Sequence, residues 1–154
     1  MTARAITDGL FELHDDGTIT LVGGYSPSSG RYHFPLLQSC PYSGATDVET
    51  VELSTDATLW LWTAVTAAPP GYAGPVPFGF GVVELDREQL RVITRLTEPD
   101  PAQLTAGQAM RLVAETLPGD HGDPVVTWAF QAQPGGPGEP TTWSRDRGPE
   151  GAAA

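Results

Sequence analysis

Four positions between residues 26 and 43 have the spacing of a metal site, although only one of them carries a good metal-binding side chain. Ser26 and Ser29 are separated by two residues, and Cys40 and Ser43 repeat this spacing after ten further residues. With cysteine at all four positions the pattern would be C-x2-C-x10-C-x2-C, the spacing of a four-thiolate zinc site. Serine hydroxyls are poor zinc ligands at neutral pH. We therefore expect a segment that keeps the turns of a zinc ribbon, with these four as vestigial ligand positions and no bound zinc.

Cys40 is the only cysteine of the chain, which excludes an internal disulfide. A nucleophilic role would require a nearby cation or imidazole that lowers the pKa of its thiol. His33 lies seven residues before Cys40, and no sequence pattern pairs the two. The sequence favours an inert remnant of the metal site. Partial metal binding by Cys40 with His33, and catalysis by Cys40, are the alternatives.

The elements that position these residues are expected to be short β-strands. Glycine (18 residues) and proline (15 residues) are frequent, which is typical of strands joined by turns. Alternating or β-branched runs between turn signals predict strands at 18–22 and 31–34 and an exit strand at 48–53. Residues 9–13 fit either a short strand or one helical turn.

The rest of the chain is predicted to form a five-stranded barrel. The five apolar runs that predict its strands are residues 58–65, 78–85, 90–96, 108–117 and 125–130. Gly79 and Gly81 predict a bend or a close backbone approach in the second strand. Five short strands of this kind favour an OB-fold. We expect a lead-in and ribbon at 1–53, the OB-fold domain at 54–132 and a disordered tail at 133–154.

The charge of the chain excludes several classes of partner. Nineteen Asp+Glu residues oppose eight Lys+Arg residues, all of them arginine, and the formal net charge is -11. Nucleic-acid backbones and anionic membranes bind basic surfaces, so we expect neither as a partner. The sequence has no apolar run of membrane-spanning length and no basic leader before an apolar run. We therefore expect a cytoplasmic protein.

The order of several short motifs resembles a known family. From about Gly17 to Phe130 the chain is similar to OB-fold proteins with an N-terminal rubredoxin-like zinc ribbon, catalogued as domain of unknown function 35, which accompany acyl-CoA enzymes. The motifs that carry the resemblance are Gly23-Gly24-Tyr25-Ser26, Gly30-Arg31-Tyr32-His33-Phe34-Pro35, Cys40-Pro41-Tyr42-Ser43-Gly44, Leu59-Trp60-Leu61-Trp62-Thr63-Ala64-Val65, Pro69-Pro70-Gly71-Tyr72, Pro75-Val76-Pro77-Phe78, Val83-Glu84-Leu85 and Thr94-Arg95-Leu96.

The resemblance implies a non-catalytic accessory subunit of an acyl-CoA-processing complex, and hence a hetero-oligomer. Proteins of this family accompany thiolase-like enzymes, acyltransferases or retro-aldolases, and the alternative partner is a MaoC-like enoyl-CoA hydratase. The OB domain would contribute acyl-CoA binding, and the ribbon would contact the partner. Ser26, Ser29 and Ser43 depart from the family pattern, which removes zinc from the expected cofactors.

Arginine and aromatic residues are the candidate contacts for coenzyme A. Arg91 and Arg95 are four residues apart on a predicted strand and should project from one face, with Ile93 between them. Arginine suits the phosphates of coenzyme A, so we expect these two, with Arg31, to meet its nucleotide end. Tyr72 would stack either on its adenine or on a side chain of the partner. The alternative is a solvated strand face on which the arginines pair with nearby carboxylates.

A second group of aromatic residues is the candidate partner interface. Trp60 and Trp62 are two apart and should share one face of their strand, covered either by the chain itself or by a partner. Tyr32 and Phe34 of the ribbon are further candidates for this interface.

Two other functions fit the sequence less well. A single-stranded nucleic-acid binder of the OB class needs a positive groove, which conflicts with the net charge of -11. A free-standing enzyme would need a paired acid and base, a metal signature or a nucleophile elbow, and none is recognisable. No residue is predicted to be catalytic.

Overall fold

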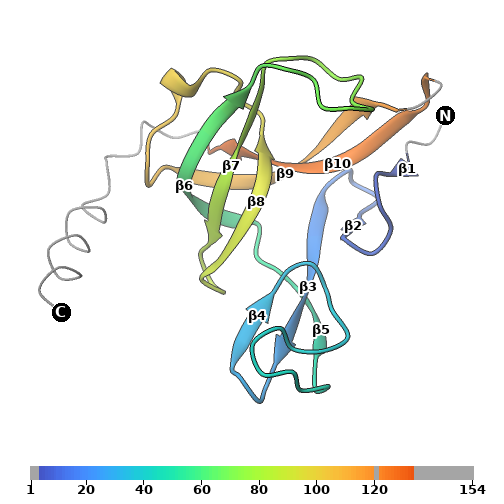
Figure 1. Cartoon of the computed structure of the whole chain (residues 1–154), viewed down its shortest axis with the longest axis vertical. Coiled ribbons are helices and arrows are strands. Elements are labelled where there is room, and N and C mark those ends of the chain that lie inside the picture. The colour runs from blue at the N-terminus through green and yellow to red at the C-terminus, as the bar shows by residue number, and fades with distance from the viewer. Residues whose placement is uncertain (1–3, 120–121, 134–154) are drawn as a thin grey trace, which may run out of the picture.

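A closed β-barrel carries a smaller ribbon-like sheet. The computed structural model describes residues 4–119 and 122–133, so the predicted tail lies outside the described residues except for Gln133. Figure 1 shows the barrel strands β6 to β10 at the top and the sheet of β3, β4 and β5 extending below them. Within the described part of the chain, no helix is long and apolar enough to cross a membrane.

Five strands close the barrel. They are β6 (Asp56–Val65), β7 (Phe78–Leu85), β8 (Leu90–Leu96), β9 (Ala109–Pro118) and β10 (Pro124–Ala132). Their order is β10-β8-β7-β6-β9, and pairing of β9 with β10 completes the ring. A short strand, β1 (Arg4–Ala5), joins β10 in parallel, and the 3₁₀ turn η1 (Pro101–Gln103) lies between β8 and β9. The predicted mostly-β, five-stranded OB-like barrel is therefore confirmed.

The second sheet is built around one long strand. β3 (Ile19–Ser26) pairs with β2 (Phe11–Leu13), β4 (Arg31–His33) and β5 (Glu49–Glu52). The division predicted at residue 53 stays a prediction; it falls between β5, which pairs with β3, and β6, which pairs with β7 and β9.

Gly23 and Gly24 lie inside a strand, because β3 continues through both. A Cβ on Gly24 would collide with the imidazole of His33, and one on Gly23 would lie 2.8 Å from Leu53 Cδ1. Small residues are required here because neighbouring groups cross the strand at close range.

One hydrophobic core links the barrel to β2 and the first half of β3. Barrel residues of this core include Leu59, Val83, Leu85, Val92, Leu96, Met110 and Phe130, and Phe11, Ile19 and Leu21 belong to the same cluster. The indole of Trp128 on β10 lies 6.3 Å from the ring of Phe11 and 5.7 Å from the ring of Phe34. The ribbon is thus attached to the barrel by aromatic packing.

A β-bulge in β6 changes which residues face outward. Leu59 pairs with Val83, but Leu61 pairs with Val82, so Trp60 is an extra residue in its strand. An extra residue reverses the alternation of side chains beyond it. Leu59 is fully buried in the core, whereas Leu61 is 58% exposed.

The prediction that Trp60 and Trp62 share a face is therefore wrong. Trp62 packs against the core, and its Nε1 donates to the carbonyl oxygen of Pro101 at 3.0 Å. The Nε1 of Trp60 instead donates to Glu84 Oε2 at 3.2 Å. The sequence could not predict which tryptophan faces the core, because both alternating sets of side chains in the Leu-Trp-Leu-Trp run are apolar.

Close backbone approach at β7, predicted from its glycines, makes Gly81 sensitive to substitution. A Cβ there would collide with the carbonyl oxygen of Leu61 and lie 3.0 Å from the Cα of Trp62. We expect Gly81→Ala to lower the free energy of unfolding by about 1–3 kcal/mol through overpacking. Chemical denaturation measures the change, and Thr63→Ala on the exposed side of β6 is the control. An unchanged midpoint for Gly81→Ala would show that the barrel relaxes there at no cost.

Candidate functional site

The outer face of β6, β7 and β8 carries an exposed row of apolar side chains. Leu61 pairs with Val82, and Val82 pairs with Ile93, so the three residues lie side by side across the sheet; we call them the outer apolar row. Leu61 is 58% exposed and Ile93 is 64% exposed. Phe80, on the same face of β7, is 38% exposed. Contiguous apolar side chains in this number are typical of a surface that another molecule covers.

Arg91 borders one side of this row. Its guanidinium lies 3.6 Å from the centroid of the Trp60 ring, close enough for a cation–π contact. Thr58, Glu84 and Arg91 are register partners in the three strands, and the indole of Trp60 bonds to Glu84. Arg91 is therefore on the predicted outward face, stacked on an aromatic ring.

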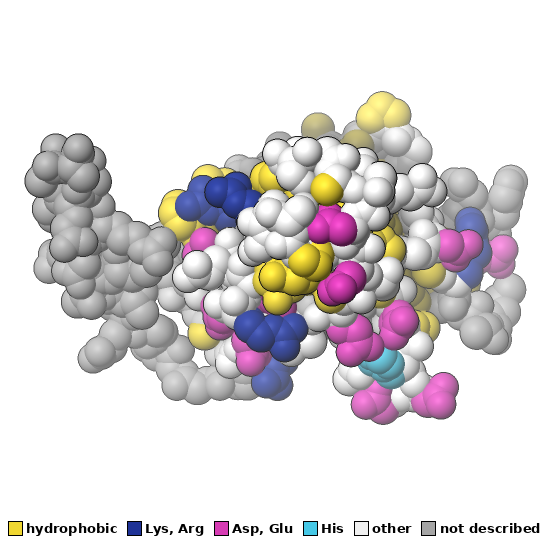
Figure 2. Space-filling view, turned by 90° about the horizontal axis from the view of Figure 1, so that it is seen from below, with side chains coloured by type: hydrophobic (Ala, Val, Ile, Leu, Met, Phe, Trp, Pro, Cys, Tyr) yellow, Lys and Arg dark blue, Asp and Glu magenta, His cyan; other side chains and the backbone are white. Residues whose placement is uncertain are grey.

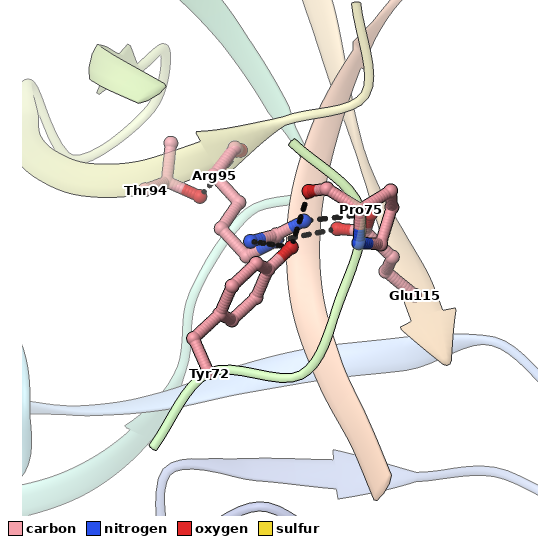
Figure 3. Close-up of polar contacts among 5 residues, drawn as sticks. All are labelled: Tyr72, Pro75, Thr94, Arg95 and Glu115. Carbon is pink, nitrogen blue, oxygen red and sulfur yellow. Dashed lines mark hydrogen bonds and ion pairs between the residues drawn. The ribbon is translucent and has the colours of Figure 1, made fainter. Parts of the chain in front are cut away.

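Arg95 borders the other side, where its side chain is already engaged (Figure 3). Its Nε and Nη2 donate to the two carboxylate oxygens of Glu115 at 2.9 and 3.1 Å, and Nη1 donates to Tyr72 Oη at 3.4 Å. Burial opposes the charge, but the bonds to Glu115 and Tyr72 outweigh it, and the pKa of Arg95 is raised above its ordinary value. Arg95 is thus a fixed cation that holds the 66–77 loop to β8 and β9.

Tyr72 lies in that loop and packs on the chain itself. Its hydroxyl donates to the carbonyl oxygen of Pro75 at 2.9 Å, and its ring centroid lies 5.0 Å from that of Phe78 (Figure 3 shows the hydroxyl). Of the four predicted coenzyme A contacts, the structure brings together only Arg95 and Tyr72. Arg91 lies on Trp60, and Arg31 lies on the ribbon, where its guanidinium is 4.9 Å from the centroid of Tyr42.

The vestigial ligand positions lie on two turns of similar form. The carbonyl oxygen of Ser26 accepts from the N–H groups of Ser29 at 3.2 Å and Gly30 at 2.8 Å, and the carbonyl oxygen of Cys40 accepts from Gly44 N–H at 2.8 Å. The last residue of each turn has a positive φ, +66° at Gly30 and +75° at Gly44. Glycine adopts this conformation without strain, which explains the matching x-x-x-x-Gly patterns.

Asp47 joins the side chains of these turns. Its Oδ1 accepts from the hydroxyl of Ser26 at 2.6 Å and from the hydroxyl of Ser28 at 3.2 Å, and its Oδ2 accepts from the Ser28 N–H at 2.8 Å. The hydroxyl of Ser28 also lies 3.2 Å from that of Ser43 on the second turn. We call these four residues, Ser26, Ser28, Ser43 and Asp47, the serine–aspartate cluster.

The thiol of Cys40 lies beside this cluster. Its sulfur is 3.4 Å from the hydroxyl of Ser29, and the residue is only 2% exposed. Hydrogen bonds from Ser29, then Ser43 and Ser26, lower the pKa of the Cys40 thiol to about 6. All four vestigial positions therefore converge. Among the described residues, no group of three or more His, Cys, Asp and Glu side chains is arranged to hold a metal ion.

The ribbon aromatics predicted at the partner interface differ in position. Phe34 packs edge-on against Trp128 inside the molecule, while the ring of Tyr32 lies 4.8 Å from that of Tyr25. Both are partly buried against the core. Intrachain packing therefore engages both rings at least in part.

Sequence reasoning missed Asp47, Leu61 and Ile93 as residues of interest. Ile93 had a recognisable signal, because it lies between two arginines of the same strand face. Asp47 had none, because it is outside both turn motifs. Figure 2 shows the acidic surface that the composition indicated, with acidic side chains spread widely over this view and basic ones confined to a few places.

Comparisons with known proteins agree with this architecture. Residues 50–115 match the family model described as ChsH2, C-terminal OB-fold domain. A search of curated proteins gives no match. Among solved structures, the chain is similar to a chain of the Ltp2-ChsH2(DUF35) aldolase, with 23% sequence identity, coverage of 73% of this chain and 84% of that chain, and a TM-score of 0.54. At that identity, the structural likeness shows the fold.

Proposed function

We propose that the protein is an accessory subunit of an acyl-CoA-processing complex, because residues 50–115 match the model described as ChsH2, C-terminal OB-fold domain. The catalytic groups would lie on a partner protein, and this chain would contribute assembly contacts and part of the acyl-CoA site. The solved relative is named for an aldolase, which favours a thiolase-like or retro-aldolase partner for this chain over a hydratase.

The observation that carries this proposal is the outer apolar row. Leu61 and Ile93 are large apolar side chains that are more than half exposed, and both are in register with Val82 on the outer face of the barrel. Protein interfaces commonly have an apolar centre and a polar rim with arginine. Arg91 supplies such a rim here, on the same face of β8 as Ile93, while Arg95 on that face is paired with Glu115.

This proposal revises the predicted interface. Leu61 and Ile93 form its centre, and Trp60 lies at its edge with Arg91 on its ring. Trp62 and Phe34 face the interior and support the surface from within.

Co-expression with each thiolase-like or hydratase-like protein of the source genome tests the proposed function. We expect one thiolase-like protein to co-elute with the chain in size-exclusion chromatography. The variants Leu61→Asp and Ile93→Asp should weaken that complex about 10- to 100-fold, because each places a charge in the apolar centre.

Val76→Asp is the matched control. Val76 is 43% exposed, but it lies in the 66–77 loop and outside the outer apolar row. The Val76→Asp variant should therefore leave the complex intact. A chain that elutes alone beside every candidate contradicts the accessory role, and equal loss for all three variants contradicts the assignment of the interface.

A further inference from the structure

A cleft of about 500 Å³ separates the ribbon from the turn between β7 and β8. Its lining residues include Arg31, Tyr32 and Tyr42 on the ribbon side and Arg87, Glu88 and Gln89 on the barrel side. Its volume is in the range of small-molecule sites. It is distinct from the outer apolar row, none of whose residues lines it.

Two of the eight arginines of the chain line this cleft, although the formal net charge is -11. The Nε and Nη2 of Arg87 bond to Glu88 Oε1 at 2.9 and 2.8 Å, and Nη2 also donates to the carbonyl oxygen of Glu52 at 3.1 Å. These contacts fix the plane of the guanidinium. Within the described residues no bond uses its Nη1, which is available to an anion.

Glu88 balances the charge of Arg87 as its ion-pair partner, with Arg87 Nη2 and Glu88 Oε1 2.8 Å apart. Its side chain has no exposure, and its carboxylate accepts from the N–H of Ser54 at 3.1 Å and from the hydroxyl of Ser54 at 2.6 Å. The carboxylate is thus turned into the protein, where it orients Arg87. Arg31 makes no ion pair with any described residue, and its guanidinium lies 4.9 Å from the centroid of the Tyr42 ring.

An aromatic surface lies beside the arginines. Tyr42 is 50% exposed, and its hydroxyl donates to the carbonyl oxygen of Tyr32 at 3.3 Å, which fixes the ring at the cleft wall. Aromatic rings of this kind stack on nucleobases, with a contribution from neighbouring arginine. Arginine forks bind phosphate.

Gln89 adds a backbone observation. It has a φ of +52°, the only positive value for a non-glycine residue in the described part of the chain. Glycine is the unstrained choice at such a position, and strained residues gather at binding sites. The carboxamide side chain of Gln89, at the wall of the cleft, can offer both a hydrogen-bond donor and an acceptor to a polar ligand.

We propose that this cleft binds a nucleoside phosphate, with the base against Tyr42 and the phosphate between Arg31 and Arg87. In the proposed function this nucleoside phosphate is the nucleotide end of coenzyme A, so the identity of the ligand rests on that proposal. A free nucleotide shares the same chemistry, and the test separates the two sources.

Calorimetry on the purified chain, without any partner, tests the site with 3′,5′-ADP, coenzyme A, AMP and inorganic phosphate. We expect 3′,5′-ADP and coenzyme A to bind alike and phosphate alone to bind at least about tenfold more weakly. Equal binding of AMP would support the site and assign it to a free nucleotide. Absence of binding by all three nucleotides at millimolar concentration would overturn the proposal, whatever the outcome of the co-elution experiment.

Variants locate the site. Arg31→Ala and Arg87→Ala should each weaken 3′,5′-ADP binding about tenfold or more, whereas Arg111→Ala, which removes the same charge outside the cleft, should not. Tyr42→Phe should keep most of the affinity and Tyr42→Ala should lose it, which separates ring stacking from the hydroxyl bond. Because Arg87 also holds Glu88, melting temperatures accompany each variant. Unchanged affinity in both Arg31→Ala and Tyr42→Ala would place any binding elsewhere and overturn the proposal.

Discussion

The triple variant Ser26→Cys/Ser29→Cys/Ser43→Cys is expected to bind zinc tightly and to melt at a higher temperature with the metal than without it. The two turns already have matched geometry, each ending in a glycine of positive φ. The hydroxyl of Ser29 lies 3.4 Å from the sulfur of Cys40, and a tetrahedral zinc with Zn–S bonds near 2.3 Å requires sulfur atoms about 3.8 Å apart. Only small shifts would complete the site.

Elemental analysis and cobalt substitution measure this result. Structural zinc contributes on the order of 10 kcal/mol in zinc-finger peptides, so the stabilisation should be large and should be reversed by a chelator. The control adds Cys40→Ala to the triple variant, which removes the fourth ligand and should sharply lower the affinity. A triple variant that retains no metal would show that the four positions converge without the geometry of a zinc ribbon.

The barrel could be predicted from the sequence because its strands are separated by strong turn signals. The predicted ranges 78–85 and 90–96 coincide with β7 and β8, where a short acidic turn joins two alternating runs. The faces of β6 could not be predicted in the same way. The bulge at Trp60 depends on pairing with β7, and an apolar run gives no signal of the position at which the alternation reverses.

The candidate sites were predictable only where local spacing determines geometry. The two turns at 26–30 and 40–44 follow from short-range patterns, and the outward face shared by Arg91 and Arg95 follows from the strand period. The partners of those side chains come from elsewhere in the chain. Glu115 reaches Arg95 from β9, and Arg87 meets the ribbon across the cleft. Such contacts depend on barrel closure, which residue types alone do not encode.

Two physical features hold the ribbon together in the described part of the chain. Phe34 and Phe11 pack against Trp128, so the ribbon shares the core of the barrel. The serine–aspartate cluster provides the second feature, since Asp47 bonds directly to two residues of the first turn and reaches the second through Ser28. Apolar packing is insensitive to pH, but the Asp47 bonds are not, and this difference allows the two to be separated.

Replacing Asp47 by asparagine is expected to loosen the two turns while leaving the barrel folded. The hydrogen bond from the Ser26 hydroxyl lowers the pKa of the Asp47 carboxyl below its ordinary value. Burial opposes this shift, and the hydrogen bonds from Ser28 add to it. A carboxyl with a lowered pKa in the folded state stabilises that state above its unfolded pKa, about 3.9, and this effect is lost as the pH falls through the folded value. Wild type and Asp47→Asn should therefore differ at neutral pH and converge in acid.

Amide hydrogen exchange resolves this effect by position. The Ser28 amide, which donates to Asp47 at 2.8 Å, should exchange about tenfold faster or more in Asp47→Asn at pH 7, whereas barrel amides should not change. Asp16→Asn is the matched control, because the Asp16 carboxylate accepts from the N–H of Thr18 at 3.0 Å and from its hydroxyl at 2.6 Å in a turn outside the cluster. Faster exchange of Ser28 in both variants would indicate a general charge effect. Faster exchange in Asp47→Asn alone, vanishing at low pH, would show that a carboxylate now joins the two turns at the position where a ribbon protein uses its metal.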